Sequence, residues 1–496
     1  MRVLFTQLPP LHRPQDTEPG AFLVKDDWDD YGFKTSFRLW CSDGSRQIEV
    51  GFLKIATLGM ESGRVELPET FETLDPSYFS LAGDEGFYAT LRDSFDSQTR
   101  NLILTTLRDA AYDLTIFEQA AGELVMRKSL LRGTEAQTVR GQFHRIAEGG
   151  ETRTAFDVIY RQEPSEGDGP SLKIVLAVNP HTKPPSNIHA LIGSNGVGKT
   201  RLLHTLAKTV LSKHGTRDGS ELHNRGEARL HPFTNLVSVS FSAFDSQGPL
   251  QASRDVGYTY VGLKKPDATV KDHSVLGGEF AESVAACMSQ GPAAAKRWQN
   301  VLERLEETDP LFHEQDISRL AAPDGERPDP RAVFARLSSG HKIVLLTLAR
   351  LVQHMTERTL VLIDEPEAHL HPPLLSTFIR VLSALLVNRN GLALVATHSP
   401  VVLQETPREA VWALRRAGND VRVEHPEIQT FGENVGVITR EIFALEVTRT
   451  GFHAMIETLA RQGRSFDQIV EDFNGKLGAE GRALARAAAR RHQNGG

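Results

Sequence analysis

The chain has 496 residues, of which 40% are hydrophobic and 24% charged, and its formal net charge is −7. This length allows two or three domains with a sizeable core, and the composition is that of a soluble globular protein. The negative balance excludes a global basic field that would attract nucleic acid, so any DNA contact requires a local basic patch.

Cysteine content and terminal sequence indicate the compartment. The two cysteines, Cys41 and Cys287, lie far apart and predict reduced thiols rather than a disulfide framework. The first twenty residues lack the pattern of a signal peptide, and no stretch approaches the roughly 20 apolar residues of a membrane span. We therefore expect a soluble cytoplasmic protein with no membrane partner.

The first third of the chain changes from strand-like to helical patterns. Residues 34–58 alternate apolar and polar side chains on either side of Ser42-Asp43-Gly44, which predicts a β-hairpin. Residues 76–133 space apolar side chains by three and four, which predicts helices. Strands are predicted next at 154–162 and 171–180.

The remaining chain alternates strands and helices around two long inserts. A strand, a Gly-rich loop and a helix are expected in "NIHALIGSNGVGKTRLLHTLAKTVL", and another buried strand near 235–245. Residues 246–335 contain helical stretches without sustained heptads, so no long coiled-coil arm is predicted. A strand in "TLVLIDE", a helix at about 372–388 and a strand in "GLALVATHS" follow.

The Gly-rich loop "GSNGVGKT" has the spacing of a phosphate-binding loop between a strand and a helix. Glycines let the backbone amides turn inward around phosphate, and the following helix N-terminus adds its dipole. Lys199 would reach the β- and γ-phosphates of ATP, and the Thr200 hydroxyl would bind Mg²⁺. The expected nucleotide-binding residues of this loop are Gly193, Ser194, Asn195, Gly196, Val197, Gly198, Lys199 and Thr200.

Two adjacent acids end the strand in "TLVLIDEPEAHLHPP". Ligands of α/β sheets bind at the carboxyl ends of strands, where Asp364 and Glu365 would lie. Asp364 is suited to the Mg²⁺ water shell, and Glu365 to polarising the attacking water. The spacing of His369 and His371 is not that of a zinc site, so we expect them to shape the loop after the strand.

A third strand ends in Thr397-His398-Ser399. A lone histidine there is commonly a polar strand end. Because it follows the phosphate loop and the Asp-Glu pair in order, we interpret His398 as a sensor of the γ-phosphate that orients Glu365 and the water.

The segment "LSSGHK" opens a helix shortly before the Asp-Glu strand. Ser338 and Ser339 are N-cap residue types, and a helix N-terminus binds anions. Two hydroxyls and Gly340 at an internal helix start therefore indicate that something anionic docks there, whereas a plain capped helix would be the alternative if the motif stood alone.

Together these motifs resemble the heads of ABC-type ATPases, with Leu337-Ser338-Ser339-Gly340-His341 in place of the signature Leu-Ser-Gly-Gly-Gln. The resemblance implies that Ser338, Ser339 and Gly340 contact ATP held by a second copy of the chain. Ser339 and His341 depart from the signature, which puts tight closure of the dimer in doubt. Gln247 is a candidate for the Q-loop glutamine.

Within this class, "DEPEAHLHP" and "ATHSP" resemble SMC-related and OLD-like ATPases. The segments "DDWDDYGFKTSFRL", "FSAFD" and "TFGENVGVITREIFALEV" resemble the ATPase subunit (PtuA) of Septu-type anti-phage systems. That resemblance implies a cytoplasmic oligomeric ATPase that acts with a separate HNH nuclease subunit. Alternatives are an SMC/OLD-like ATPase of DNA repair and an ATP-gated scaffold with little turnover.

The resemblance implies an α/β fold, a P-loop ABC-type ATPase head with an N-terminal β-rich subdomain and helical insertions. The expected parts are a β-rich part of the head at 1–75, a helical insertion at 76–150, a core lobe with the phosphate loop at 151–245, a helical signature subdomain at 246–335, the core with signature, Asp-Glu strand and His398 at 336–425, and a helical partner-binding tail at 426–496.

No nuclease pattern stands out along the chain, so we expect that it does not cut nucleic acid itself. Basic side chains occur at 199–229 and, at four-residue spacing, at Arg482, Arg486 and Arg490. A solvated helix face is the favoured interpretation of both, and docking of DNA or of a nuclease is the alternative.

Overall fold

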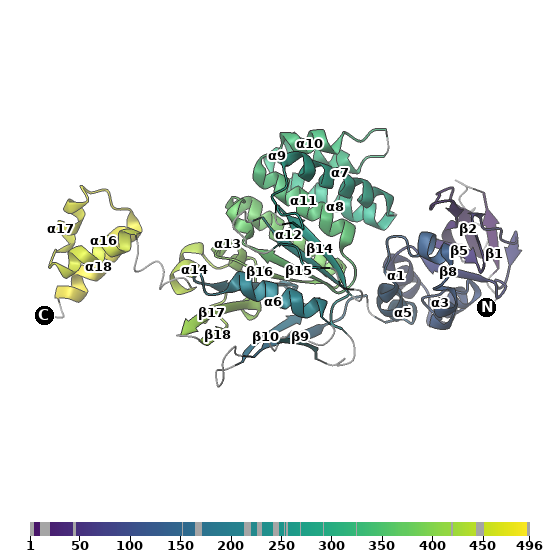
Figure 1. The fold of residues 1–496 in the computed structure, drawn as a ribbon, viewed down its shortest axis with the longest axis horizontal. Helices are drawn as coiled ribbons and strands as arrows, with labels where there is room; N and C mark the ends of the chain where they lie inside the picture. The colour runs from purple at the N-terminus through teal and green to yellow at the C-terminus, as the bar shows by residue number, and fades with distance from the viewer. Residues whose placement is uncertain are drawn as a thin grey trace.

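The computed structural model describes residues 4–9, 20–42, 46–150, 152–163, 171–212, 220–225, 231–241, 248–251, 253, 256–267, 269–290, 292–323, 325–417, 420–442 and 451–493. An N-terminal domain, a central α/β core and a C-terminal group of helices follow one another along the chain (Figure 1). Each of the three has hydrophobic cores of its own.

The N-terminal domain is a sheet covered by helices. Its sheet order is β7-β1-β2-β4-β5-β8, and the predicted hairpin is the antiparallel pair β4–β5. The strands are β1 (Phe5–Leu8), β2 (Gly20–Lys25), β4 (Ser36–Ser42), β5 (Gln47–Thr57), β7 (Thr70–Phe71) and β8 (Tyr78–Ala82), with β3 (Phe33–Lys34) and β6 (Gly63–Arg64) as a separate pair. The helical elements are α1 (Glu85–Ser94), α2 (Ser97–Thr106), α3 (Leu114–Ala120), η1 (Met126–Leu130), α4 (Ala136–Thr138), η2 (Val139–Phe143) and α5 (His144–Ala147).

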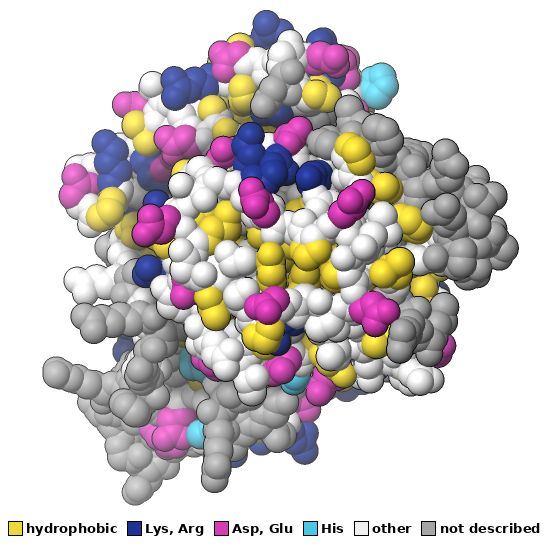
Figure 2. Space-filling view, turned by 90° about the vertical axis from the view of Figure 1, so that its right-hand side faces the viewer, with side chains coloured by type: hydrophobic (Ala, Val, Ile, Leu, Met, Phe, Trp, Pro, Cys, Tyr) yellow, Lys and Arg dark blue, Asp and Glu magenta, His cyan; other side chains and the backbone are white. Residues whose placement is uncertain are grey.

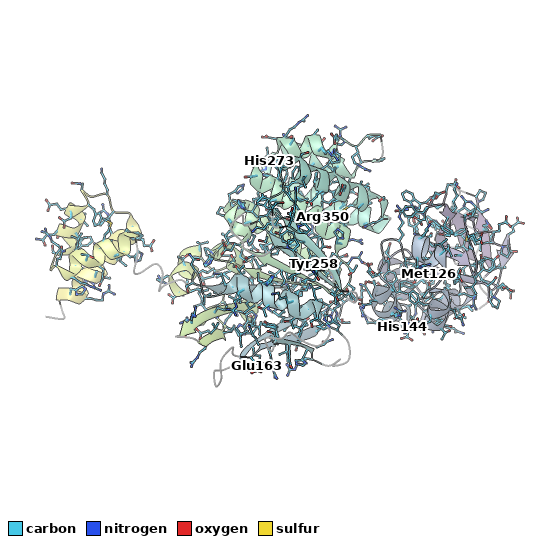
Figure 3. The ribbon with its side chains drawn as sticks, viewed as in Figure 1. Met126, His144, Glu163, Tyr258, His273 and Arg350 are labelled. Atoms are coloured by element: carbon cyan, nitrogen blue, oxygen red, sulfur yellow. The ribbon has the colours of Figure 1, made fainter. Side chains whose placement is uncertain are left out.

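This domain differs from the sequence-based division at residue 75. Strand β8 lies within the stretch expected to be helical, and buried side chains from Phe5 to Ala147 form one hydrophobic cluster. Met126 and His144, labelled in Figure 3, both belong to this domain. The helices bury their apolar faces against the sheet that precedes them, so sheet and helices form one folding unit.

The core is built on a seven-stranded sheet of order β14-β13-β15-β16-β11-β17-β18, in which only β18 runs antiparallel to its neighbour. Its strands are β11 (Ile188–Gly193), β13 (Asn235–Ser240), β14 (Gly257–Gly262), β15 (Thr359–Asp364), β16 (Leu392–Ala396), β17 (Val411–Ala417) and β18 (Asp420–Glu424). The carboxyl ends of β11, β15 and β16 meet at one edge of the sheet.

The two faces of this sheet are covered differently, because alternate side chains of each strand point to opposite sides. Leu360 and Leu362 pack toward α6 (Lys199–Leu211) and an antiparallel three-stranded sheet of order β10-β9-β12. Val361 and Ile363 pack toward the helical lobe. The small sheet contains β9 (Phe156–Gln162), β10 (Leu172–Val178) and β12 (Ser220–Asn224).

The helical lobe forms the larger of the two layers over the sheet, and Arg350 in Figure 3 lies on its helix α11. Its main helices are α7 (His273–Ser289), α8 (Pro292–Thr308), α9 (Pro310–Glu314), α10 (Pro330–Arg336), α11 (Ser339–His354), α12 (Pro372–Asn388), α13 (Pro400–Gln404) and α14 (Val435–Ile442), with 3₁₀ turns η3 (Ile317–Ala321), η4 (Pro366–Ala368) and η5 (Arg408–Ala410). The C-terminal helices are α16 (Gly451–Arg461), α17 (Phe466–Asp472) and α18 (Ala479–Gln493).

Among the residues that the structure describes, two ion pairs join the N-terminal domain to the core. Arg389 at the end of α12 lies 2.9 Å from Glu85, and both side chains are about nine-tenths buried. Arg145 lies 2.8 Å from Glu357, which precedes β15. In the part of the chain that the structure describes, no helix is long and apolar enough to cross a membrane.

Candidate functional site

The loop between β11 and α6 has the backbone that a phosphate loop requires. Gly196 and Gly198 adopt φ angles of 75° and 109°, which side-chain-bearing residues rarely adopt. Gly198 directly precedes α6, so the N-terminus of this 13-residue helix opens into the loop. The predicted strand–loop–helix unit is confirmed, and its glycine-rich backbone and helix dipole suit an anion.

Lys199 is held inside the curve of its own loop. Its Nζ donates to the Gly193 carbonyl at 3.0 Å and forms a short hydrogen bond with His398 Nε2. The side chain is largely buried, at 5% exposure. A cation fixed at this place lies beside any phosphate that enters the loop.

Thr200 and Asp364 lie together, although 164 positions separate them in the sequence. The Thr200 hydroxyl donates to Asp364 Oδ2 at 2.8 Å. The two residues come from the start of α6 and the end of β15. A hydroxyl and a carboxylate at this spacing are hard oxygen ligands of the kind Mg²⁺ binds next to phosphate, so the pair fits the metal that accompanies ATP.

Glu365 and His398 face each other at the same edge of the sheet. His398 Nε2 lies 3.5 Å from Glu365 Oε1, and the Glu365 side chain is 44% exposed. Glu365 has a left-handed backbone with φ of 47°, and its amide donates to the Ala396 carbonyl of β16 at 2.9 Å. This strained backbone turns the carboxylate out of the strand end toward solvent, where it could polarise a water molecule.

The backbone amide of His398 is also fixed by a residue that sequence reasoning missed. This N–H donates to Glu367 Oε1 at 2.5 Å, which connects the turn after β15 to the end of β16. Glu367 lies two residues after the predicted carboxylate, but its partner depends on the pairing of β15 with β16. Gln247, the candidate Q-loop residue, lies outside the described residues.

Ser338 caps α11 as the sequence predicts. Its Oγ accepts from the His341 amide, and the same oxygen lies 2.6 Å from His341 Nδ1. Both Ser338 and Ser339 are exposed at the start of this 16-residue helix. The Ser338 hydroxyl is therefore bonded within the chain, whereas the exposed Ser339 hydroxyl and the N-terminus of this long helix suit an anion from another molecule.

Packing within the chain is enough to require glycine at position 340. The expectation that a docked anion explains this glycine is therefore not needed. A Cβ at this position would lie 2.6 Å from the carbonyl oxygen of His369. The start of α11 thus packs directly against the loop after β15 in the same chain. The anion interpretation now depends on Ser338 and Ser339.

His341, which replaces the signature glutamine, is buried between two partners. Its Nε2 lies 3.0 Å from Asp309 Oδ1, so a chain of hydrogen bonds runs from Asp309 through His341 to Ser338. His371 lies beside them, and single ligand atoms of Asp309, His341 and His371 all fall within 4.8 Å of one another. These three residues could hold a divalent ion, although the hydrogen bonds already satisfy His341.

The expected roles of His369 and His371 in shaping the loop are confirmed. His371 caps α12 by accepting from the Leu374 amide at 3.4 Å, and His369 Nε2 lies 3.2 Å from the Phe241 carbonyl. The contact between Asp309 and His341 could not be predicted from the sequence. The two residues are 32 positions apart, and the packing of α9 against α11 brings them together.

Two arginines of the tail form contacts within the C-terminal group of helices. Arg482 donates to the carbonyls of Leu477 and Gly475, and Arg486 lies over the Phe466 ring at 4.6 Å. The contacts of Arg482 and Arg486 support the solvated-face interpretation of the tail over a continuous DNA-binding stripe. Figure 2 views the molecule from the side of the N-terminal domain, and on that face Lys and Arg side chains are interspersed with Asp and Glu. Lys213, Arg217 and Arg229 of the other basic segment lie outside the described residues.

Comparison with known proteins gives the family. Residues 291–404 match the family described as an AAA domain of the AbiEii toxin type, from type IV TA systems. The chain is 35% identical over 498 residues to Protein ea59 of Escherichia phage lambda, and the match covers 94% of both proteins. The chain belongs to the family of Protein ea59. The phosphate loop between β11 and α6 and the mostly parallel core sheet confirm the predicted α/β fold class.

Solved structures match the chain only at low identity and low TM-score. UvrA2 from Deinococcus radiodurans is 14% identical, and the match covers 54% of this chain and 37% of that chain, with a TM-score of 0.30. The chain thus matches about a third of UvrA2. CbiO1 from Clostridium perfringens, part of an ABC transporter complex, is 16% identical, and the match covers 59% and 95% of the two chains, with a TM-score of 0.31.

Proposed function

We propose that this chain binds and hydrolyses ATP with Mg²⁺ at its phosphate loop. The observation that carries the proposal is the convergence of Thr200, Asp364, His398 and Glu365 on Lys199 at one edge of the sheet. These residues come from two strand ends, those of β15 and β16, and from the start of α6. Structural needs alone give no reason for a lysine, two acids and a histidine to meet there.

Each side chain has a distinct task in this proposal. Lys199 neutralises charge on the β- and γ-phosphates, while Thr200 and Asp364 hold Mg²⁺, directly or through its water shell. Glu365 polarises the water that attacks the γ-phosphate. His398 bonds a terminal oxygen of that phosphate and, 3.5 Å from Glu365, keeps the carboxylate in position. Catalysis of this kind depends on positioning and on charge stabilisation.

The second half of the site would come from another copy of the chain. Ser338 and Ser339 are exposed at the N-terminus of a long helix, and such a terminus suits the γ-phosphate of ATP bound by a partner. Gly340 would contribute its backbone amide there. We therefore propose a homo-oligomer, at least a dimer, with composite nucleotide sites.

For the cellular role, we propose control of a separate HNH nuclease in anti-phage defence. The resemblance to Septu ATPase subunits motivates this role, and the AAA family shared with AbiEii-type toxins is compatible with it. The partner would bind the helical tail at 426–496, and local basic side chains leave direct DNA binding open. Co-expression with the neighbouring reading frame tests it: a co-purifying HNH protein supports the role, and a neighbour without that motif contradicts it.

The alternatives differ in their demands on the chain. An SMC-type repair ATPase needs a long coiled coil, yet in the described part of 246–335 the longest helices, α7 and α8, have 17 residues each and pack in the core cluster. A scaffold with little turnover would not need Glu365. Turnover itself therefore discriminates between scaffold and enzyme.

The experiment is ATP hydrolysis by the purified full-length chain and by Glu365→Gln. The amide cannot polarise water as the carboxylate does, so the rate should fall about 10²- to 10⁴-fold while ATP still binds. The exposed Glu427→Gln serves as the control and should retain the wild-type rate. Chelation of Mg²⁺ should stop hydrolysis. Wild-type activity in Glu365→Gln would remove the assignment of the catalytic carboxylate.

A further inference from the structure

A cavity of about 230 Å³ lies where the N-terminal domain meets the core, away from the phosphate loop. One water molecule needs only about 10–15 Å³, and small-molecule sites are common at domain interfaces. Its wall combines N-terminal residues with the α7–α8 junction and the end of α12. Its charged side chains include Asp84, Glu85, Arg297 and Arg389, and its apolar ones include Phe52 and Met288.

Arg297 of α8 is the unusual member of this wall. The described residues offer its guanidinium neither a hydrogen bond nor an ion pair within 4.0 Å, although a guanidinium carries five N–H donors. Burial, together with the nearby charge of Arg389, lowers the pKa of Arg297 to about 9. A buried cation without a contacting partner is costly, so something else must compensate it.

Two further polar atoms of the wall lack partners among the described residues. One terminal nitrogen of Arg389 pairs with Glu85 at 2.9 Å, but the Arg389 Nε is buried without an acceptor. The hydroxyl of Thr138 is likewise buried and unsatisfied. Both atoms are fully buried, so a ligand in the cavity would not reach them. The guanidinium of Arg297 offers only donors, and an acceptor-rich group in the cavity would satisfy it.

The acids of the wall are already engaged. Asp30 lies 2.7 Å from Lys54 and 2.6 Å from Arg132, and Glu85 is paired with Arg389. Asp84 accepts from the Gly86 amide at the start of α1, and burial raises its pKa. Asp26 also lines the wall and accepts from the Trp28 amide, so the wall holds four acids and four cations. Among these cations, Arg297 is the one that no described residue contacts through a hydrogen bond or an ion pair.

We infer that this cavity binds a small organic anion whose carboxylate or phosphate group pairs with Arg297. Phe52, Leu130 and Met288 supply an apolar wall for the carbon body of such a ligand. The ligand would contact both the N-terminal domain and α8. Because Trp298 and Val301 of α8 share a hydrophobic cluster with Val344 of α11, it would also brace the lobe that carries Ser338.

The test compares the thermal unfolding midpoints of the wild-type chain, Arg297→Met and Arg304→Met, with and without millimolar inorganic phosphate as the probe. Arg304 is an exposed arginine on the same helix and serves as the matched control. Without phosphate, Arg297→Met should have the highest midpoint, because the change removes a buried charge that no described residue contacts through a hydrogen bond or an ion pair. With phosphate, the wild type and Arg304→Met should shift upward by a few degrees, and Arg297→Met by less than half as much.

Two results would overturn the inference. A lower midpoint for Arg297→Met in phosphate-free buffer would mean that Arg297 already serves as the structural counter-ion of Asp84 and Glu85. An equal phosphate shift in Arg297→Met and Arg304→Met would mean that the anion binds elsewhere. Phosphate bound at the Gly193–Thr200 loop shifts all three proteins alike, so this outcome is independent of the ATPase proposal.

Discussion

At the scale of single residues, the candidate site depends on where one ammonium group lies. Lys199 Nζ contacts the Gly193 carbonyl and His398, so it connects the loop that binds phosphate to the residue proposed to sense it. A neutral side chain at this position would leave the triphosphate charge without its buried counter-charge. Loss of the Lys199 charge should therefore weaken the binding of ATP, a step that precedes hydrolysis.

Lys199→Ala should therefore weaken ATP binding at least tenfold, since hydrogen bonds to charged groups contribute about 1.5–3 kcal/mol each. Lys208→Ala, which removes an exposed lysine from the same helix, is the control and should bind ATP normally. A calorimetric titration of both variants measures the difference. Equal affinities would refute the assignment of the phosphate loop.

At the scale of elements, the start of α11 is fixed by contact with the loop after β15. Gly340→Ala places a Cβ 2.6 Å from a backbone carbonyl that cannot move alone, which should cost about 1–3 kcal/mol of unfolding free energy. The matched control is Gly277→Ala in α7, where the nearest atom to the new Cβ is 3.7 Å away. Denaturant unfolding should show a clear loss only for Gly340→Ala, and equal stabilities would contradict the close packing.

The elements also show what the sequence could predict. The strand–loop–helix around Lys199 and the strand ending at Asp364 were predictable, because each pattern is local and each strand is a continuous apolar run. Strand β8 and the single core of the N-terminal domain were not predictable. The end of this domain depends on which sheet the helices after residue 82 pack against, and a local pattern does not show that. The hydrogen bonds that join Asp309, His341 and Ser338 were equally unpredictable, because they depend on a tertiary contact.

At the scale of the whole molecule, the central claim is that one chain does not complete a nucleotide site. The groups that converge on Lys199 come from the sheet edge, whereas Ser338 and Ser339 face outward from the helical lobe. The proposal therefore requires two copies, each of which gives its phosphate loop to one site and its signature serines to the other. Lesions in the two halves should then complement each other.

The most direct measurement is ATP hydrolysis by a mixture of two inactive variants, Ser338→Arg and Lys199→Ala, with subunit exchange confirmed beforehand. Ser338→Arg puts bulk and charge at an exposed position, so it should fold, bind ATP through its own loop and fail to hydrolyse it. In a mixed dimer, one site pairs an intact loop with intact serines, and the other carries both lesions. The mixture should therefore regain part of the wild-type rate. Normal hydrolysis by Ser338→Arg alone, or no recovery despite subunit exchange, would contradict it.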